Sequence, residues 1–162
     1  MNEGHRPNTQ HAVLELYRLL AIFLASKNFA SIRTDYSGEE FDPINYIQSV
    51  ESDEITRLLL NLSITARVID DREGNFLAGL GTNCGKLEKV SAIKSSEILT
   101  LRDACNKIIH AGKIRFDSAQ QDGQRYLNPI VYLYGELHGK EWKATIDLIE
   151  FVKQYYSLIC HL

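Results

Sequence analysis

Three polar residues that could do chemistry follow one another at four-residue steps within residues 101–111. Arg102, Asn106 and His110 predict a polar stripe along one side of a helix. An apolar seam borders this stripe, formed by Ile98, Leu101, Cys105 and Ile108. A histidine can act as acid or base near neutral pH, and an arginine fork fits a phosphate. At a rise of about 1.5 Å per residue, Arg102 and His110 lie about 12 Å apart along the axis, so only an extended Arg102 leaning toward Asn106 could share a ligand with His110.

The same stretch resembles the signature helix of the HEPN superfamily, whose members are small helical bundles common in toxin, defence and mobile-element proteins. The family pattern is an arginine, often followed by asparagine, with a histidine a few residues further on. Asn106 and His110 match this pattern in type and spacing. Cys105 occupies the arginine position, and Arg102 is the nearest arginine. The surrounding pattern is similar to that of stand-alone HEPN-like proteins, including some carried on integron gene cassettes.

The resemblance implies an RNA-directed protein, because some HEPN proteins are metal-independent endoribonucleases. RNA carries its own nucleophile, the 2′-hydroxyl, so cleavage needs a base, an acid and positive donors around the phosphate. His110, Arg102 and Asn106 are the candidate catalytic residues. HEPN ribonucleases usually pair two motif helices in one cleft, so the resemblance also implies a homodimer.

Cys105 in the arginine position leaves a second interpretation open. The chain could be a catalytically inactive HEPN-like dimer that acts as a binding or antitoxin-type module, with a cognate toxin or antitoxin protein as its partner. Whether the protein is an enzyme is therefore undecided at this level, and an accidental motif match in a plain helical protein is a third interpretation.

The charge of the chain is unevenly distributed around a net value of −3. Residues 1–85 contain 7 Lys and Arg against 12 Asp and Glu, whereas residues 86–162 contain 11 against 9. The motif helix lies in the basic part, as a phosphate-facing surface requires, although a solvated helix face would look the same. The candidate RNA contacts are Lys107, Lys113 and Arg115.

The composition predicts a single domain over 1–162 with an ordinary hydrophobic core, since 44% of the residues are hydrophobic and 24% are charged. The three cysteines are far apart and form no Cys-x-x-Cys pair, so we expect free thiols and neither a metal site nor a cofactor. No apolar run is long enough to span a membrane, and residues 1–4 do not look like a signal peptide. We therefore expect a cytoplasmic protein.

Long helices dominate the predicted fold. A first helix capped by Asn8 or Thr9 runs to about Asn28, and its wide apolar stripe favours a central place or a dimer contact. A second helix, capped by Ser52, ends near the adjacent carboxylates Asp70 and Asp71, which we interpret as a solvated terminus. Residues 76–94 are expected to form a glycine-rich loop near the motif helix. The motif helix itself is expected to start at Ser95 or Ser96 and to close on Gly112.

After a polar insertion over 117–125, the hydrophobic period changes to two. Residues 130–137 and 140–146 predict a hairpin around His138-Gly139, with Gly135 opposite Trp142. Tyr132, Tyr134 and Lys143 fall on its outer face and could stack bases, although such tyrosines often only shield a hairpin. With a last helix after it, the sequence predicts a mainly α fold: an HEPN-like bundle of four to five helices with one β-hairpin before the C-terminal helix.

Overall fold

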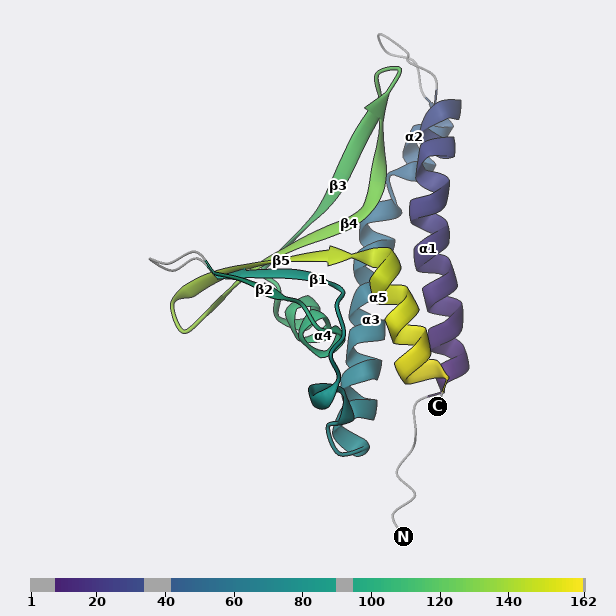
Figure 1. Cartoon of the computed structure of the whole chain (residues 1–162). Helices are drawn as coiled ribbons and strands as arrows, with labels where there is room; N and C mark the ends of the chain where they lie inside the picture. Colours follow the sequence, from purple (N-terminus) through teal and green to yellow (C-terminus); the bar gives the residue numbers. More distant parts are fainter. Residues whose placement is uncertain (1–7, 34–41, 90–94, 162) are drawn as a thin grey trace.

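A five-stranded antiparallel sheet and a set of helices share one hydrophobic core in the computed structural model, which describes residues 8–33, 42–89 and 95–161 (Figure 1). The helical elements are α1 (Thr9–Ile32), α2 (Pro43–Gln48), α3 (Glu51–Arg72), the 3-10 helix η1 (Phe76–Gly79), α4 (Leu101–His110), α5 (Leu148–Tyr155) and the π-helical turn η2 (Tyr156–Cys160). The strands are β1 (Gly85–Lys89), β2 (Ser95–Ile98), β3 (Lys113–Gln121), β4 (Gln124–Leu137) and β5 (Lys140–Asp147).

The sheet has the strand order β2-β1-β5-β4-β3, so β1 is an interior strand paired with β5 far along the chain. Two-residue turns join β3 to β4 and β4 to β5. In both turns, Asp122-Gly123 and His138-Gly139, the two residues adopt positive φ, as a tight hairpin turn between twisted strands requires. A register shift after Phe116 bends the long β3–β4 hairpin.

The helices cover one face of the sheet and one of its sides. Figure 1 shows α4 under the sheet, while α1 and α3 run side by side along one edge of the molecule and α5 returns beside them. The buried core is formed by leucines and isoleucines of α1, α3 and α4 together with Val131, Leu133, Ala144 and Ile146 of the sheet. In the described part of the chain no helix is long and apolar enough to cross a membrane.

The predicted mainly α bundle is wrong, because the C-terminal half of the chain is dominated by the sheet. The expected loop over 76–94 contains η1 and the interior strand β1, and its last residues, 90–94, lie outside the described ranges. The polar insertion over 117–125 is the tip of the β3–β4 hairpin. These strands were missed because only Leu87 of β1 is buried and because β3 is polar along much of its length, so neither shows a clear period of two.

The motif helix also differs from the prediction at both ends. Thr100 caps α4, and its hydroxyl accepts a hydrogen bond from the Asp103 amide at 3.2 Å, while Ser95 and Ser96 belong to β2. At the other end Ala111 is extended, and the Gly112 amide donates to the carbonyl of Tyr134 at 2.8 Å. The helix therefore ends by entering the sheet and has no left-handed glycine.

Two other local predictions are confirmed, whereas the predicted Ser52 cap is wrong, because Ser52 lies within α3 and the cap residue Val50 forms no side-chain hydrogen bond. Asn8 caps α1 through the Gln10 amide at 2.9 Å, and the helix extends to Ile32. The β4–β5 register places Gly135 opposite Trp142, as predicted. A Cβ atom on Gly135 would lie 2.2 Å from the Trp142 ring, so only glycine leaves room for the indole.

Candidate nucleic-acid interface

The side chain of Arg102 is held by a buried carboxylate. Its Nε lies 3.1 Å from Oδ2 of Asp70, which has no solvent exposure and whose other oxygen accepts the Leu77 amide at 2.8 Å. Arg67 lies 3.9 Å from the same carboxylate. The interpretation of Asp70 as a solvated terminus is thus wrong, whereas its neighbour Asp71 is exposed. Arg102 therefore joins α4 to α3 through Asp70.

The other motif residues are not brought together with Arg102. Asn106 is half-buried, and His110 is exposed at the C-terminal end of α4. Within the described residues neither side chain forms a hydrogen bond or ion pair. Cys105, in the arginine position, is fully buried, and burial raises the pKa of its thiol to about 12, so it is no nucleophile at neutral pH. Within one chain, α4 therefore assembles no acid, base and phosphate donor around one point.

The predicted RNA contacts are divided between two places. Lys107 lies on α4 with its Nζ 4.4 Å from the centroid of the Trp142 ring, and partial burial lowers the pKa of its ammonium group. Lys113 and Arg115 lie on the edge strand β3, where both are exposed. The structure thus groups Lys113 and Arg115 and separates them from Lys107.

Lys113 and Arg115 belong to two cross-strand rows on the sheet face that the helices do not cover. The first row contains Lys113, Tyr134, Lys143 and Glu88, and the second contains Arg115, Tyr132, Thr145 and Lys86. The residues between them, such as Leu133 and Ala144, point into the core. The sequence pattern predicts Tyr132, Tyr134 and Lys143 on this outer face, and the observed register confirms it.

We call Tyr132, Tyr134, Lys143, Lys113 and Arg115 the tyrosine platform. The Nζ of Lys143 lies 4.7 Å from the ring centroid of Tyr132 and 5.7 Å from that of Tyr134. The hydroxyl of Tyr132 donates a hydrogen bond to Oδ1 of Asp117 at 3.0 Å, which holds the ring in place. The same hydrogen bond raises the pKa of the phenol. The platform therefore combines two half-exposed aromatic rings with three positive charges.

Acidic residues also lie on this face, and two of them, Glu88 and Asp117, are bonded to neighbouring side chains. Glu88 is 3.4 Å from Lys86, and Asp117 accepts bonds from both Tyr132 and Asn128. Glu136 and Glu141 face each other one row closer to the β4–β5 turn. In the described part of the chain Lys113 and Arg115 form no ion pair, so their charges remain available to an anion. At the edge of the platform a hollow of about 600 Å³ is lined by Lys113, Arg115, Tyr134 and Lys143 and also by Glu136 and Glu141.

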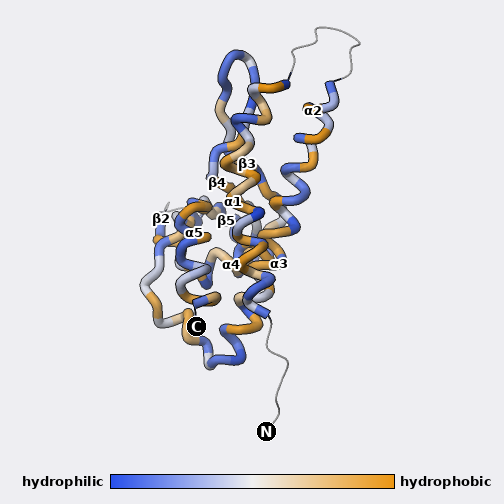
Figure 2. The backbone as a smooth tube through the Cα atoms, turned by 90° about the vertical axis from the view of Figure 1, so that its right-hand side faces the viewer, coloured by the Kyte–Doolittle hydropathy of each residue, from blue (hydrophilic) through white to orange (hydrophobic). Residues whose placement is uncertain are grey.

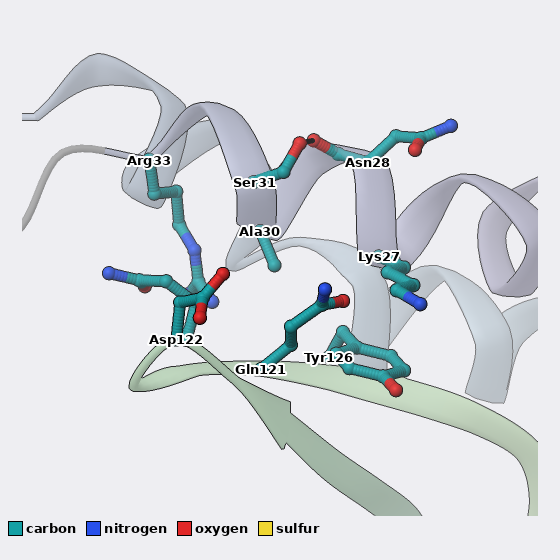
Figure 3. A pocket seen from close by; sticks show the side chains of 9 residues that line it. Lys27, Asn28, Ala30, Ser31, Arg33, Gln121, Asp122 and Tyr126 are labelled. Carbon is teal, nitrogen blue, oxygen red and sulfur yellow. Dashed lines mark hydrogen bonds between the residues drawn. The ribbon is translucent and has the colours of Figure 1, made fainter.

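A second hollow, of about 490 Å³, lies between the end of α1 and the tip of the β3–β4 hairpin (Figure 3). Lys27 is next to Tyr126 there, with 5.6 Å between its Nζ and the ring centroid. Arg33 donates to the carbonyl of Arg125 and so fastens the hairpin to the helix. None of the sequence-predicted site residues lines this hollow.

The described residues form no cluster of metal ligands, and both Cys84 and Cys105 are buried. No three His, Cys, Asp or Glu side chains gather there as a metal site would require. Cys84 is buried, its thiol donates to Oε1 of Gln154 at 3.1 Å, and burial raises the pKa of that thiol to about 12. The tyrosine platform is therefore the arrangement with the clearest binding chemistry.

Compared with protein-family models, with curated protein sequences and with solved structures, the chain gives no significant match.

Proposed function

We propose that this protein binds single-stranded RNA on the tyrosine platform and acts as a binding module. The observation that carries the proposal is the position of Lys143 over Tyr132 and Tyr134, beside the exposed Lys113 and Arg115. Single strands bind proteins by stacking bases on aromatic rings while nearby cations neutralise the phosphates. Half-buried tyrosines on a rigid sheet lose little freedom on binding, which favours such stacking.

The arrangement favours a single strand over a duplex. Tyrosine rings offer flat surfaces to unstacked bases, which a duplex does not expose. We propose RNA rather than DNA because residues 101–111 resemble a motif of RNA-directed proteins. The proposal also places the protein in the cytoplasm, where RNA is abundant. Because Arg102 is bound to Asp70, cleavage is not part of the proposed function.

The first test measures binding of a fluorescently labelled, mixed-sequence 12-nucleotide RNA by anisotropy in EDTA and low salt. The variants are Tyr134→Leu and the double substitution Lys113→Gln/Arg115→Gln. Loss of one stacked base is worth about 1–3 kcal/mol, so Tyr134→Leu should weaken binding roughly tenfold. The matched controls, Tyr156→Leu and Lys153→Gln, replace exposed residues near the C-terminus and should bind as the wild type does.

Equal affinities in all five proteins, or no binding by the wild type at about 100 µM, would overturn the proposal. A DNA strand of the same sequence shows whether the 2′-hydroxyl contributes.

In parallel, end-labelled RNA is incubated with wild type and with His110→Ala. Cleavage that this substitution abolishes would restore the endoribonuclease interpretation, whereas intact RNA in both reactions agrees with a binding module.

A further inference from the structure

The helix α1 is apolar on two opposite faces. Its inner face, with Leu16, Leu19 and Phe23, is buried in the core. On the outer face Leu14, Tyr17 and Leu24 are 48%, 71% and 66% exposed. Figure 2 views the side of the molecule on which α1 lies and shows hydrophobic residues recurring along that helix. Exposed apolar residues that gather along one side of a helix mark a contact surface, so the outer face of α1 calls for a partner.

The exposed residues have the spacing of a helix-pairing seam. Their intervals alternate between four and three residues, which keeps them on one line of the helix, and the seam consists of Gln10, Leu14, Tyr17, Ala21, Leu24 and Asn28. No member of the seam is charged. Between Gln10 and Asn28 the seam extends about 27 Å at 1.5 Å per residue.

The order of residue types along the seam identifies the partner. Counted from its midpoint at Leu19, the seam has a leucine five residues away and an amide nine residues away in each direction, while large Tyr17 and small Ala21 lie two residues to either side. Two copies in antiparallel orientation would therefore place Leu14 against Leu24, large Tyr17 against small Ala21, and Gln10 against Asn28. Such self-complementarity about a midpoint is what a two-fold interface between identical chains requires.

Charges beside the seam are compatible with this pairing. Arg18 lies close to the midpoint, so the two copies would bring two arginines near each other. The pKa of the Glu54 carboxyl in α3 is lowered first by its hydrogen bond to Arg57 and to a smaller extent by the charge of Arg18. Because Glu54 is already paired with Arg57 at 2.6 Å, it reduces the repulsion between the two arginines only in part.

We propose that the protein forms an antiparallel homodimer through the outer face of α1. A fully buried aromatic side chain removes about 150–250 Å² from water, and the seam contains one tyrosine, two leucines that are half to two-thirds exposed, one alanine and two amides, so covering it removes on the order of 500 Å² per copy at most. This is slightly below the low end of specific interfaces, about 600 Å² per partner, and predicts a dissociation constant of about 1–100 µM. Figure 1 places α1 at one edge of the molecule with the sheet extending away from it, so the tyrosine platform stays open in the dimer.

The test is sedimentation velocity from about 1 to 200 µM. The wild type should shift from the mass of one chain, 18.4 kDa, toward twice that mass. Tyr17→Glu should remain monomeric over the whole range. The control Leu137→Glu places the same charge at a residue that is 57% exposed at the end of β4, and it should dimerise as the wild type does. Thermal melts of both variants show that they are folded.

A cross-linking experiment tests the orientation. In a Cys160→Ser background, where the remaining Cys84 and Cys105 are buried, Leu14→Cys and Leu24→Cys are each treated with a short bismaleimide. The antiparallel seam predicts cross-links only when the two variants are mixed, because residues 14 and 24 are about 15 Å apart along each helix. Any of three results would overturn the proposal: cross-linking of Leu14→Cys with itself, a protein that stays monomeric at all concentrations, or equal loss of the dimer in Tyr17→Glu and Leu137→Glu. Binding of a different protein to the outer face of α1, in competition with the second copy, would also overturn the proposal.

Discussion

The guanidinium of Arg102 neutralises a carboxylate that has no contact with solvent. The carboxylate of Asp70 in α3 accepts hydrogen bonds from Nε of Arg102 in α4 at 3.1 Å and from the amide of Leu77 in η1 at 2.8 Å. A buried charge that loses its partner is strongly destabilising, because water cannot replace the lost interaction. At this position a side chain with catalytic potential therefore stabilises the fold.

Replacement of Arg102 by alanine should accordingly reduce stability. We expect Arg102→Ala to lower the free energy of unfolding by about 2–4 kcal/mol, since Arg67 at 3.9 Å only partly compensates. Urea unfolding followed by circular dichroism measures the change. The control Arg57→Ala removes an exposed ion pair with Glu54 and should change stability much less. Equal effects of the two substitutions would show that Asp70 does not depend on Arg102.

Gly135 provides a second prediction for a single residue. An added Cβ would lie 2.2 Å from the Trp142 ring, so Gly135→Ala must displace the indole from its buried place on β5. Overpacking of this kind costs about 1–3 kcal/mol. Trp142 is the single tryptophan of the chain, so its fluorescence reports the displacement directly. Gly81→Ala, where nothing lies within 4 Å of the added carbon, is the control and should leave both emission and stability nearly unchanged.

At the scale of the element, the start of α4 depends on Thr100. Its hydroxyl accepts from the Asp103 amide, and the Thr82 hydroxyl accepts from the Leu101 amide, so two otherwise unpaired amides of the first turn are satisfied. Thr100→Ala should cost about 1 kcal/mol in thermal or urea unfolding. Ser96→Ala, at the exposed serine that the sequence pattern favours as a cap, should change stability by less than about 0.5 kcal/mol. The reverse order would contradict the observed helix start.

A buried polar cluster joins α1, α2 and α3. Gln48 donates to Oε1 of Glu51 at 2.8 Å, Ser26 donates to Oε2 at 3.3 Å, and the Leu127 amide donates to Ser26 at 2.9 Å. Burial raises the pKa of the Glu51 carboxyl, and the two hydrogen bonds only partly oppose this. The ionisation of this carboxyl is therefore less favourable in the folded state than in the unfolded state.

This shift predicts a pH dependence with a definite sign. Because the folded pKa is raised, Glu51 contributes stability below its unfolded pKa of about 4.3, and that contribution is lost as the pH rises through the folded pKa. Glu51→Gln should therefore melt at a higher temperature than the wild type at pH 7, with the difference shrinking toward pH 4.

Glu54→Gln is the matched control with the opposite sign. Hydrogen bonding to Arg57 lowers the pKa of the Glu54 carboxyl, so its contribution is present above the unfolded pKa and lost as the pH falls. This variant should melt slightly below the wild type at pH 7 and converge with it in acid. Parallel pH profiles for the two substitutions would argue against the burial of Glu51.

At the scale of the whole molecule, the sheet brings cations from two strands to one face. Lys113 and Arg115 come from β3 and Lys143 from β5, with the tyrosines of β4 between them. If each cation contacts one phosphate, the logarithm of RNA affinity should fall with the logarithm of salt concentration with a slope of about −2, at about −0.7 per contact. Lys113→Gln/Arg115→Gln should reduce that slope to about −0.7. A slope near zero in the wild type would exclude phosphate contacts on the platform.

Local signals predicted part of this architecture correctly. The Asn8 cap, the two-residue turn at His138-Gly139 and the alternation on either side of it depend on residues close in the chain. For that reason the amino-acid sequence alone is enough to assign Tyr132, Tyr134 and Lys143 to the outer face. The Asp122-Gly123 turn carries a comparable signal, but its flanking residues are polar and hide the period of the two strands that it joins.

Helix caps, turns and hydrophobic periods act over a few residues, and they were enough to locate most helices and the last hairpin and to predict which residues of that hairpin face outward. No such local signal indicates that β1 is an interior strand paired with β5, that Asp70 binds Arg102 from 32 residues away, or that Lys113 and Arg115 join the tyrosines. These contacts join residues far apart in the chain, and their free energy comes from burial and hydrogen bonding that form only when the chain folds.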